Sequence, residues 1–174
     1  FKIIKARYAD DSQIGIVGPR SRLEEMKRSL EEVLDTMTTW FQQNGMLVNA
    51  SKTELIVCGD RRQLSRLESE TTINFMGEIL HSKTTVRNLG VTMDCFLSWE
   101  QHVQQIADRC FGILVGLLHA KQVLPIGTLP RLIDAMVFSH VRYCVQVYGG
   151  TSVTAKGKIQ KIFNFAARVI SGRR

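Results

Sequence analysis

Apolar residues follow two different spacings along this chain, and the change between them falls near residue 94. Before it, short apolar runs are separated by Asp, Asn, Gly and Ser, which is typical of β-strands joined by turns. After it, apolar residues recur every three or four positions, as they do on the buried face of an α-helix. We therefore expect an α+β fold over residues 1–94 and an all-α fold over residues 95–174.

The first element predicted is a β-hairpin. Apolar and β-branched residues dominate positions 3–9 and 14–17, and the polar cluster Asp10-Asp11-Ser12 lies between them. Asp and Ser favour turns because their side chains hydrogen-bond to nearby backbone. The polar cluster is therefore expected at the tip of the hairpin.

A long amphipathic helix is predicted next, because apolar residues recur at helical spacing from Leu23 to Phe41. Ser21 and Glu24 form a capping box at its start, and Asn44-Gly45 favours its end. Short strands are then expected over residues 46–48, 54–58, 73–75, 78–80 and 86–93. His81-Ser82-Lys83 is expected to form the turn between the last two strands.

Three helices are predicted in the rear part, separated by breaks at Leu124–Gly127 and Gly149-Gly150. The first opens on a second capping box, Ser98 with Gln101, and Thr128 is expected to cap the second. In the last helix, a stripe expected to face the bundle core comprises Ile159, Ile162, Phe163, Ala166, Val169 and Ile170.

The composition is that of a globular chain, with 44% hydrophobic and 22% charged residues. The longest apolar run, Phe111–Leu118, is too short to span a bilayer, so we expect no membrane span. The four cysteines form no C-x-x-C pair, and the four histidines show no zinc-ligand spacing. Scattered reduced cysteines suit an intracellular protein of cytoplasm or nucleus that is not secreted.

Positive charge is concentrated near the C-terminus. Residues 119–174 hold nine Lys and Arg against one acid, Asp134, a net charge of +8, whereas the whole chain carries +7. A basic end on a neutral body suits a polyanion such as nucleic acid. On charge alone, a solvated basic surface is an equal alternative.

Tyr8-Ala9-Asp10-Asp11 places two adjacent carboxylates at the tip of the predicted hairpin. Adjacent carboxylates repel each other, and a divalent cation would offset that repulsion. Mg²⁺ prefers one or two carboxylates together with water and substrate phosphates. Taken alone, however, an Asp-Asp pair is more often plain turn chemistry.

The surrounding sequence favours the metal-binding interpretation. Tyr-Ala-Asp-Asp on this hairpin resembles the catalytic signature of reverse transcriptases. Further segments follow in the order that this family shows: Trp40–Gly45, Leu47–Glu54, Val86–Asp94, Leu97–Trp99 with His102-Val103, His140–Cys144 and Ile159–Arg168. Together they cover nearly the whole chain and are similar to reverse transcriptases of non-LTR retrotransposons.

The resemblance implies a right-hand polymerase, with residues 1–94 as the C-terminal part of the palm and residues 95–174 as a helical, thumb-like region. It implies RNA-directed DNA polymerase activity by two-metal nucleotidyl transfer, with Mg²⁺ or Mn²⁺ as cofactor. Asp10 would be the principal metal ligand and Asp11 its neighbour. Tyr8 would lie near the primer end or the template.

Other matching residues would contact the substrates, which are template RNA, primer DNA and deoxynucleoside triphosphates. Lys52 would lie near the departing pyrophosphate, where it would neutralise charge or donate a proton; a solvated turn lysine is an equal alternative. The segment expected to grip the primer is Arg87, Asn88, Leu89 and Gly90. Phosphates would meet the basic residues Lys156, Lys158, Lys161 and Arg168, with Arg173 and Arg174 beyond them.

One departure from the family concerns the metal site. The family completes it with a third aspartate from an earlier palm strand, and its fingers also precede the hairpin, whereas seven residues precede Tyr8 here. Asp94 matches the primer-grip region and does not replace that aspartate. We therefore expect a truncated polymerase segment that is inactive alone; the alternative is a non-catalytic nucleic-acid-binding or scaffold remnant of a decayed element.

Overall fold

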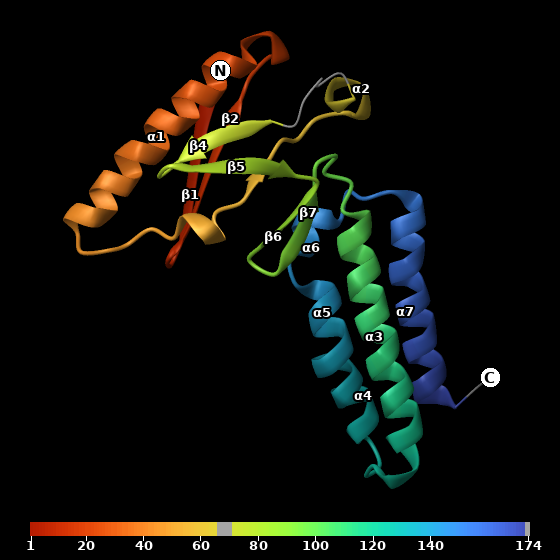
Figure 1. Ribbon diagram of the computed structural model, residues 1–174. Helices are drawn as coiled ribbons and strands as arrows, with labels where there is room; N and C mark the ends of the chain where they lie inside the picture. The colour runs from red at the N-terminus through yellow and green to blue at the C-terminus, as the bar shows by residue number, and fades with distance from the viewer. Residues whose placement is uncertain (66–70, 173–174) are drawn as a thin grey trace. The chain divides into compact units, whose positions relative to one another are not determined.

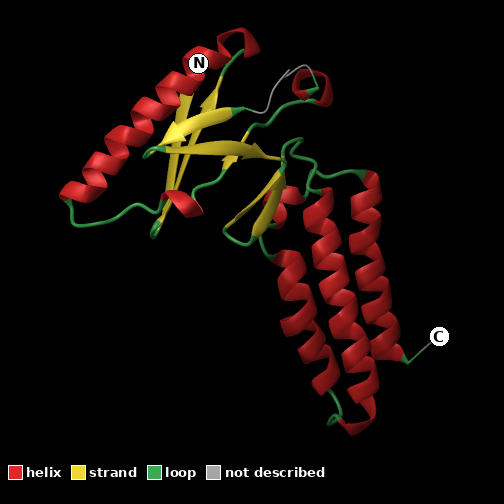
Figure 2. Ribbon diagram, viewed as in Figure 1, coloured by secondary structure: helices red, strands yellow, loops and turns green. Residues whose placement is uncertain are grey.

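The structure is a computed structural model that describes residues 1–65 and 71–172. The chain divides into two compact units, Phe1–Thr84 and Thr85–Arg174, coloured in chain order in Figure 1. The first unit is a mixture of strands and helices, and the second is a β-hairpin followed by helices (Figure 2). Mixed α and β content is therefore confirmed, while the assignment of these parts to palm and thumb stays a prediction.

The division between the units falls before the change of residue spacing expected at residue 94. The strands β6 (Thr85–Asn88) and β7 (Val91–Asp94) belong to the second unit because β7 packs on its first long helix. Val91 and Thr92 are buried in that contact, and the Thr92 hydroxyl donates to Gln105 Oε1 at 2.7 Å. A short hairpin has too little surface to be stable alone, so its packing partner decides where it belongs.

The first unit begins with the predicted hairpin. Strands β1 (Lys2–Tyr8) and β2 (Asp11–Val17) pair antiparallel, with Tyr8 opposite Asp11. The turn is therefore the two residues Ala9 and Asp10, and Asp11 already lies in the second strand rather than in the turn.

Helix α1 (Leu23–Gln43) packs against β2 and the later strand β4. The predicted capping box at its start is wrong, because Ser21 lies inside a 3-10 turn, Arg20–Arg22, and caps nothing. Instead, Arg22 forms an ion pair with Glu25 in the first turn. The predicted end at Asn44-Gly45 is confirmed, and Gly45 has a φ of +72°, which glycine adopts without strain.

A small sheet completes the first unit, with β5 (Glu78–Lys83) between β4 (Thr72–Phe75) and the parallel strand β3 (Leu55–Ile56). Its β4 side chains Ile73 and Phe75 are buried. Two predictions are wrong here. Residues 46–48 form no strand, and Leu47 among them is 92% exposed. Residues 81–83 belong to β5 rather than to a turn. The short helix α2 spans Arg61–Leu64.

The second unit begins with β6 and β7, which the sequence predicted as a single strand over residues 86–93. The chain instead reverses at Leu89-Gly90, whose φ values are +44° and +81°. Local pattern does not indicate this turn, because its first residue, Leu89, is apolar where Asn, Asp or Gly is usual. Glycine at the second position is the remaining signal for such a turn.

Asp94 joins this hairpin to helix α3 (Glu100–Ala120). Its buried carboxylate accepts hydrogen bonds from the backbone N–H groups of Phe96, Ser98 and Trp99 and from the Ser98 hydroxyl, at 2.8–3.1 Å. The predicted capping box of Ser98 and Gln101 is therefore wrong, because Asp94 receives the N–H groups that precede the helix. An acidic group in this position also interacts favourably with the helix dipole.

The remaining helices form a bundle around one apolar core. Helix α4 (Thr128–Ile133) continues through a π-helical turn (Asp134–Phe138) into α5 (Ser139–Arg142); α6 (Val145–Tyr148) and α7 (Val153–Ser171) follow. Each long helix contributes fully buried side chains, among them Val103, Cys110, Leu114, Ile133, Val137, Ile162 and Val169. The expected stripe of α7 is only partly right, because Phe163 and Ile170 are about 40% exposed at its edge.

The Asp94 junction generates a pH-dependent prediction. Burial raises the pKa of Asp94, but hydrogen bonds from Ser98, Trp99 and Phe96 together outweigh it and hold the pKa below its usual value of 3.8. The carboxylate therefore stabilises the fold fully above about pH 4, and this contribution is lost as the pH falls through the lower folded pKa. Asp94→Asn is expected to cost about 1–3 kcal/mol at pH 7, with a smaller difference from the wild type below pH 4.

Urea unfolding followed by circular dichroism at pH 7 and at pH 3 measures both effects. Asp108→Asn is the matched control, because Asp108 is an exposed acid on α3, the helix that the Asp94 segment leads into. Equal unfolding curves for Asp94→Asn and the wild type at pH 7 would contradict the structural role of this carboxylate.

Candidate functional site

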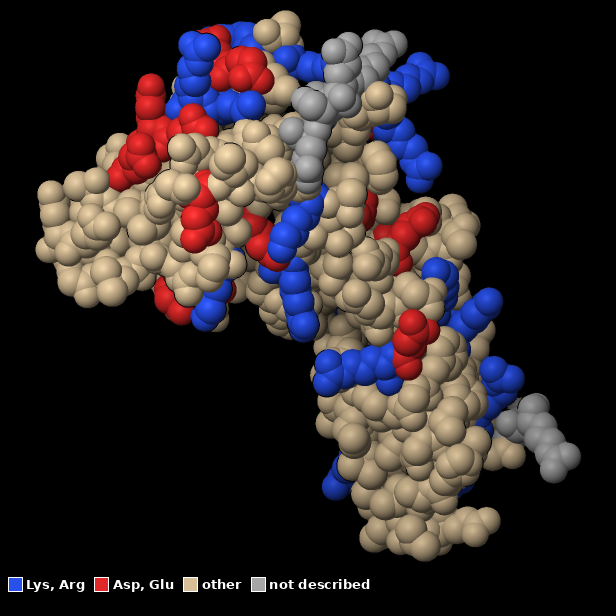
Figure 3. Space-filling model, viewed as in Figure 1, with Lys and Arg blue, Asp and Glu red and all other residues tan. Residues whose placement is uncertain are grey.

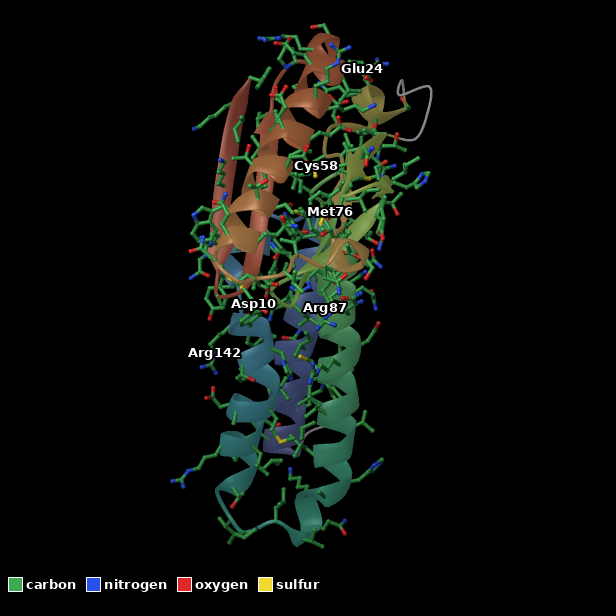
Figure 4. All side chains as sticks on the ribbon, turned by 60° about the vertical axis from the view of Figure 1, so that its left-hand side comes forward. Asp10, Glu24, Cys58, Met76, Arg87 and Arg142 are labelled. Atoms are coloured by element: carbon green, nitrogen blue, oxygen red, sulfur yellow. The ribbon has the colours of Figure 1, made fainter. Side chains whose placement is uncertain are left out.

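The Asp-Asp turn lies at the end of the β1–β2 hairpin, where Figure 4 labels Asp10. Asp10 and Asp11 are exposed, and Tyr8 is 68% exposed. Ala9 has a φ of +52°, in the left-handed region that residues other than glycine rarely adopt. The short turn thus presents both carboxylates and the tyrosine to solvent from adjoining positions.

The donor chemistry of this turn suits a hard divalent cation in part. Carboxylate oxygens are the ligands that Mg²⁺ prefers, and Mg²⁺ commonly takes one or two of them with water and phosphate oxygens. Over residues 1–65 and 71–172, no group of three or more His, Cys, Asp and Glu side chains gathers to hold a metal. The two aspartates therefore fit a site that substrate phosphates or another carboxylate would complete.

Lys52 lies elsewhere in the first unit, at the end of the 3-10 turn Ala50–Lys52, and is exposed. Asn49 shapes this turn: its side-chain oxygen accepts from the Ser51 hydroxyl at 2.6 Å, and its carbonyl accepts from the Thr53 hydroxyl at 3.2 Å. These hydrogen bonds stabilise the turn without using Lys52. The exposed lysine side chain is therefore accessible to an anion.

The segment predicted to grip a primer forms the β6–β7 turn of the second unit. Arg87, Leu89 and Gly90 are exposed, and Asn88 is half-buried. The turn rests on Tyr143, whose hydroxyl donates to the Leu89 carbonyl at 2.6 Å. A Cβ atom on Gly90 would lie 3.4 Å from the Tyr143 ring, so the turn packs closely on that ring.

The buried face of the same hairpin contacts His102. The His102 Nδ1 atom accepts from the Thr92 N–H at 3.3 Å, and the ring lies edge-on to Tyr148 at 5.2 Å between centroids. Burial lowers the pKa of His102, and the nearby Arg87 lowers it further. The imidazole is therefore mostly neutral near pH 7, and the Arg87 side chain lies at the exposed side of the hairpin.

Four of the six basic residues predicted to meet phosphates lie on α7, but not on one face; Arg173 and Arg174 lie outside the described residues. At 100° per residue, Lys158, Lys161 and Arg168 fall within roughly 80° of one another, whereas Lys156 lies on the opposite flank of the buried stripe. The Arg168 guanidinium also lies over the Phe165 ring, 5.7 Å from its centroid. Figure 3 shows blue side chains projecting from the α7 side of this unit.

Two groupings were not predicted from the sequence. Tyr143 was included in the segment His140–Cys144 without a role, and its contact with Leu89 spans 54 positions, which no local pattern reveals. Arg7 lies one residue before Tyr8, and no local pattern indicates its partners. Its guanidinium packs over the rings of Trp40 and Phe41, at 5.4 and 5.7 Å from their centroids.

Comparison with known proteins gives one informative relative. Over 173 residues, the chain is 27% identical to the "Probable RNA-directed DNA polymerase from transposon BS" of Drosophila melanogaster. The alignment covers 98% of this chain but 18% of the relative, so the chain spans less than a fifth of that protein's length. No family model and no solved structure matches the chain. Among the described helices, none is long and apolar enough to cross a membrane.

The relative aligns with almost every residue that carried the resemblance, from the Asp-Asp hairpin to α7. The match therefore confirms the resemblance drawn from the motifs: along nearly its whole length, this chain is similar to a segment of a transposon-encoded reverse transcriptase.

Proposed function

We propose that the chain is the catalytic-turn and thumb-like segment of an RNA-directed DNA polymerase of a non-LTR retrotransposon. The observation that carries the proposal is the exposed pair at the tip of the β1–β2 hairpin, Asp10 in the two-residue turn and Asp11 at the start of β2. The whole-length similarity to a transposon polymerase supports it. In this proposal the substrates are an RNA template, a DNA primer and deoxynucleoside triphosphates.

The two aspartates act by supplying carboxylate oxygens where phosphate charge must be held. Asp10 is the principal metal ligand and Asp11 its neighbour, with Mg²⁺, or Mn²⁺ in its place, as the cofactor. A pair of such ions, when bound, activates the attacking hydroxyl and stabilises the leaving oxygen. Asp10 and Asp11 are exposed at a turn, so the ligand set is open to incoming phosphates.

Lys52 and the β6–β7 turn serve the substrates in the same proposal. The exposed Lys52 ammonium neutralises charge on the departing pyrophosphate or donates a proton to it. Tyr8 lies against the primer end or template. Arg87, Asn88, Leu89 and Gly90 hold the primer strand; the backbone at Gly90 approaches closely because no side chain intervenes.

The chain is proposed to be inactive by itself, because two carboxylates are fewer than the polymerase family uses for its metal site. A non-catalytic nucleic-acid-binding or scaffold role is the competing function, and the missing third carboxylate among the described residues favours it for the isolated chain. The two functions differ in what happens when the rest of a polymerase is supplied.

Replacing the corresponding segment of the Drosophila relative with this chain tests the catalytic role. The chimera is expected to extend a primer on an RNA template, and Asp10→Ala should lower that rate about a thousandfold or more because a metal ligand is lost. Lys52→Ala should slow extension by about a hundredfold, as expected for loss of a proton donor, without abolishing it.

Asp35→Asn is the control, because it removes one negative charge from an exposed position on α1 in the same unit. Template–primer binding by each chimera is measured in parallel to show that it is folded. Unchanged extension by Asp10→Ala would refute the catalytic role of the turn. A chimera that binds template–primer but never extends it would support the non-catalytic alternative.

The basic face of α7 gives a second prediction, on the chain alone. If Lys158, Lys161 and Arg168 touch phosphates of duplex DNA, the logarithm of the binding constant should fall with the logarithm of salt concentration at a slope of about −2.7. Replacing all three by Ala should remove that slope while changing thermal stability little, because charges at the surface, here the exposed Lys161 and Arg168 and the half-buried Lys158, contribute little to folding.

Lys156→Ala is the matched control, since Lys156 lies on the opposite flank of α7 and should alter the slope less. Fluorescence anisotropy of a labelled duplex at 50–200 mM salt would measure each slope. If the salt dependence of binding is unchanged by the triple substitution, the face of α7 that carries Lys158, Lys161 and Arg168 is only a solvated surface.

A further inference from the structure

A groove in the first unit lies between β1 and the C-terminal half of α1. It has a volume of about 190 Å³ and is lined by Lys5, Ala6, Arg7, Gln13, Met37, Trp40 and Phe41. Clefts that enclose a whole drug-sized ligand usually measure 300–1,000 Å³, so this groove suits a single flat group. All of its residues belong to one compact unit.

The groove combines aromatic rings with a stacked cation. The Trp40 and Phe41 rings meet edge to face at 5.3 Å between centroids, and the Arg7 guanidinium lies over both. Trp40 is 46% exposed, so part of its ring surface stays open to a ligand. Indole and guanidinium planes are the protein groups on which nucleic-acid bases stack.

The electrostatic setting favours an anion. Lys5 and Arg7 are exposed on β1, and residues 36–51, which include the aromatic floor, contain no charged side chain. Asp10 and Asp11 are the nearest acids on the hairpin, and side-chain alternation places Asp11 on the opposite face from Ser12, which pairs with Arg7. Positive charge beside an aromatic floor is the combination that single-stranded nucleic-acid sites use.

We propose that this groove binds one base of a single-stranded nucleic acid, stacked on the open part of the Trp40 ring beside the Arg7 guanidinium, with Lys5 against the adjoining phosphate. The site is separate from the Asp-Asp turn, needs no metal, and does not depend on polymerase activity. Stacking is shared by RNA and DNA bases, so both kinds of strand should bind. Duplex DNA should not bind in this groove, because its bases already stack on each other.

The experiment titrates the 174-residue chain with fluorescently labelled ten-nucleotide strands, oligo(U) and oligo(dT), in EDTA at low salt. An abasic ten-nucleotide strand with the same phosphates serves as the probe control. Trp40 fluorescence is followed in a Trp99→Phe background, and anisotropy of the labelled strand is followed in the unaltered chain. Oligo(U) and oligo(dT) are expected to bind more tightly than the abasic strand and to quench Trp40.

Substitutions then assign the binding to the groove. Trp40→Leu should weaken binding by about 5- to 100-fold, the effect of losing one stacked base. Arg7→Lys should weaken it several-fold, because lysine keeps the charge but lacks the planar group. Arg28→Lys on α1 is the matched control and should have no effect. Combined alanine substitution of Lys158, Lys161 and Arg168 should leave the Trp40 quenching intact.

The proposal would be overturned by equal binding of the abasic strand, by binding of only one of the two base-bearing strands, or by unchanged affinity in Trp40→Leu. Circular dichroism confirms that each variant is folded, and Arg7→Lys tests the groove without removing an aromatic side chain. Failure here would leave the polymerase proposal standing, since primer extension by the chimera tests a different set of residues.

Discussion

The second unit depends on a single buried carboxylate. Asp94 ends β7 and receives four hydrogen bonds from the segment that leads into α3, including those from Ser98 and Trp99. Both Leu97 and Trp99 have positive φ, so the chain turns sharply within five residues. Such a path exposes N–H groups that need an acceptor, and a charged oxygen is the strongest one available. The Asp94 carboxylate therefore fixes the path from β7 into α3, while contacts of Thr92 with Gln105 and of Tyr143 with Leu89 also hold the β6–β7 hairpin on the bundle.

The turns of the three hairpins among the described residues can be compared with the turn of the candidate site. All have two-residue turns whose first residue has positive φ: Ala9, Met76 and Leu89. The turns at Met76 and Leu89 continue into a glycine with positive φ, as tight hairpins commonly do. Positive φ is therefore a property of the connection and not itself a mark of function. The Asp-Asp turn differs because it has aspartate where the other two have glycine.

Short-range patterns predicted those features that depend on short-range physics. The first hairpin and the end of α1 at Asn44-Gly45 are fixed by turn residues that lie beside them in the sequence. Both capping boxes failed, because their serines are held by other structure: Ser21 by a 3-10 turn and Ser98 by Asp94. The β6–β7 turn was not predicted because its first residue, Leu89, is apolar where Asn, Asp or Gly is usual. Ser21 and Ser98 show that neighbouring structure, a 3-10 turn or a carboxylate four residues away, can outweigh a capping preference.

The residues of the candidate site and of the groove likewise fall into two groups, those that the sequence indicates and those that only the fold reveals. Asp10, Asp11 and Lys52 could be chosen from the sequence because their motifs are contiguous, and the structure adds that all three are exposed. Tyr143 and Arg7 could not, because their meaning comes from partners 54 and 33 positions away: the Leu89 carbonyl and the Trp40 ring. Cationic and aromatic side chains are common on surfaces, and only their juxtaposition distinguishes a binding groove from a solvated face. A contiguous motif therefore indicates candidate residues for the proposed chemistry, whereas the fold is needed to find residues that support a turn, such as Tyr143, or that line a groove, such as Arg7.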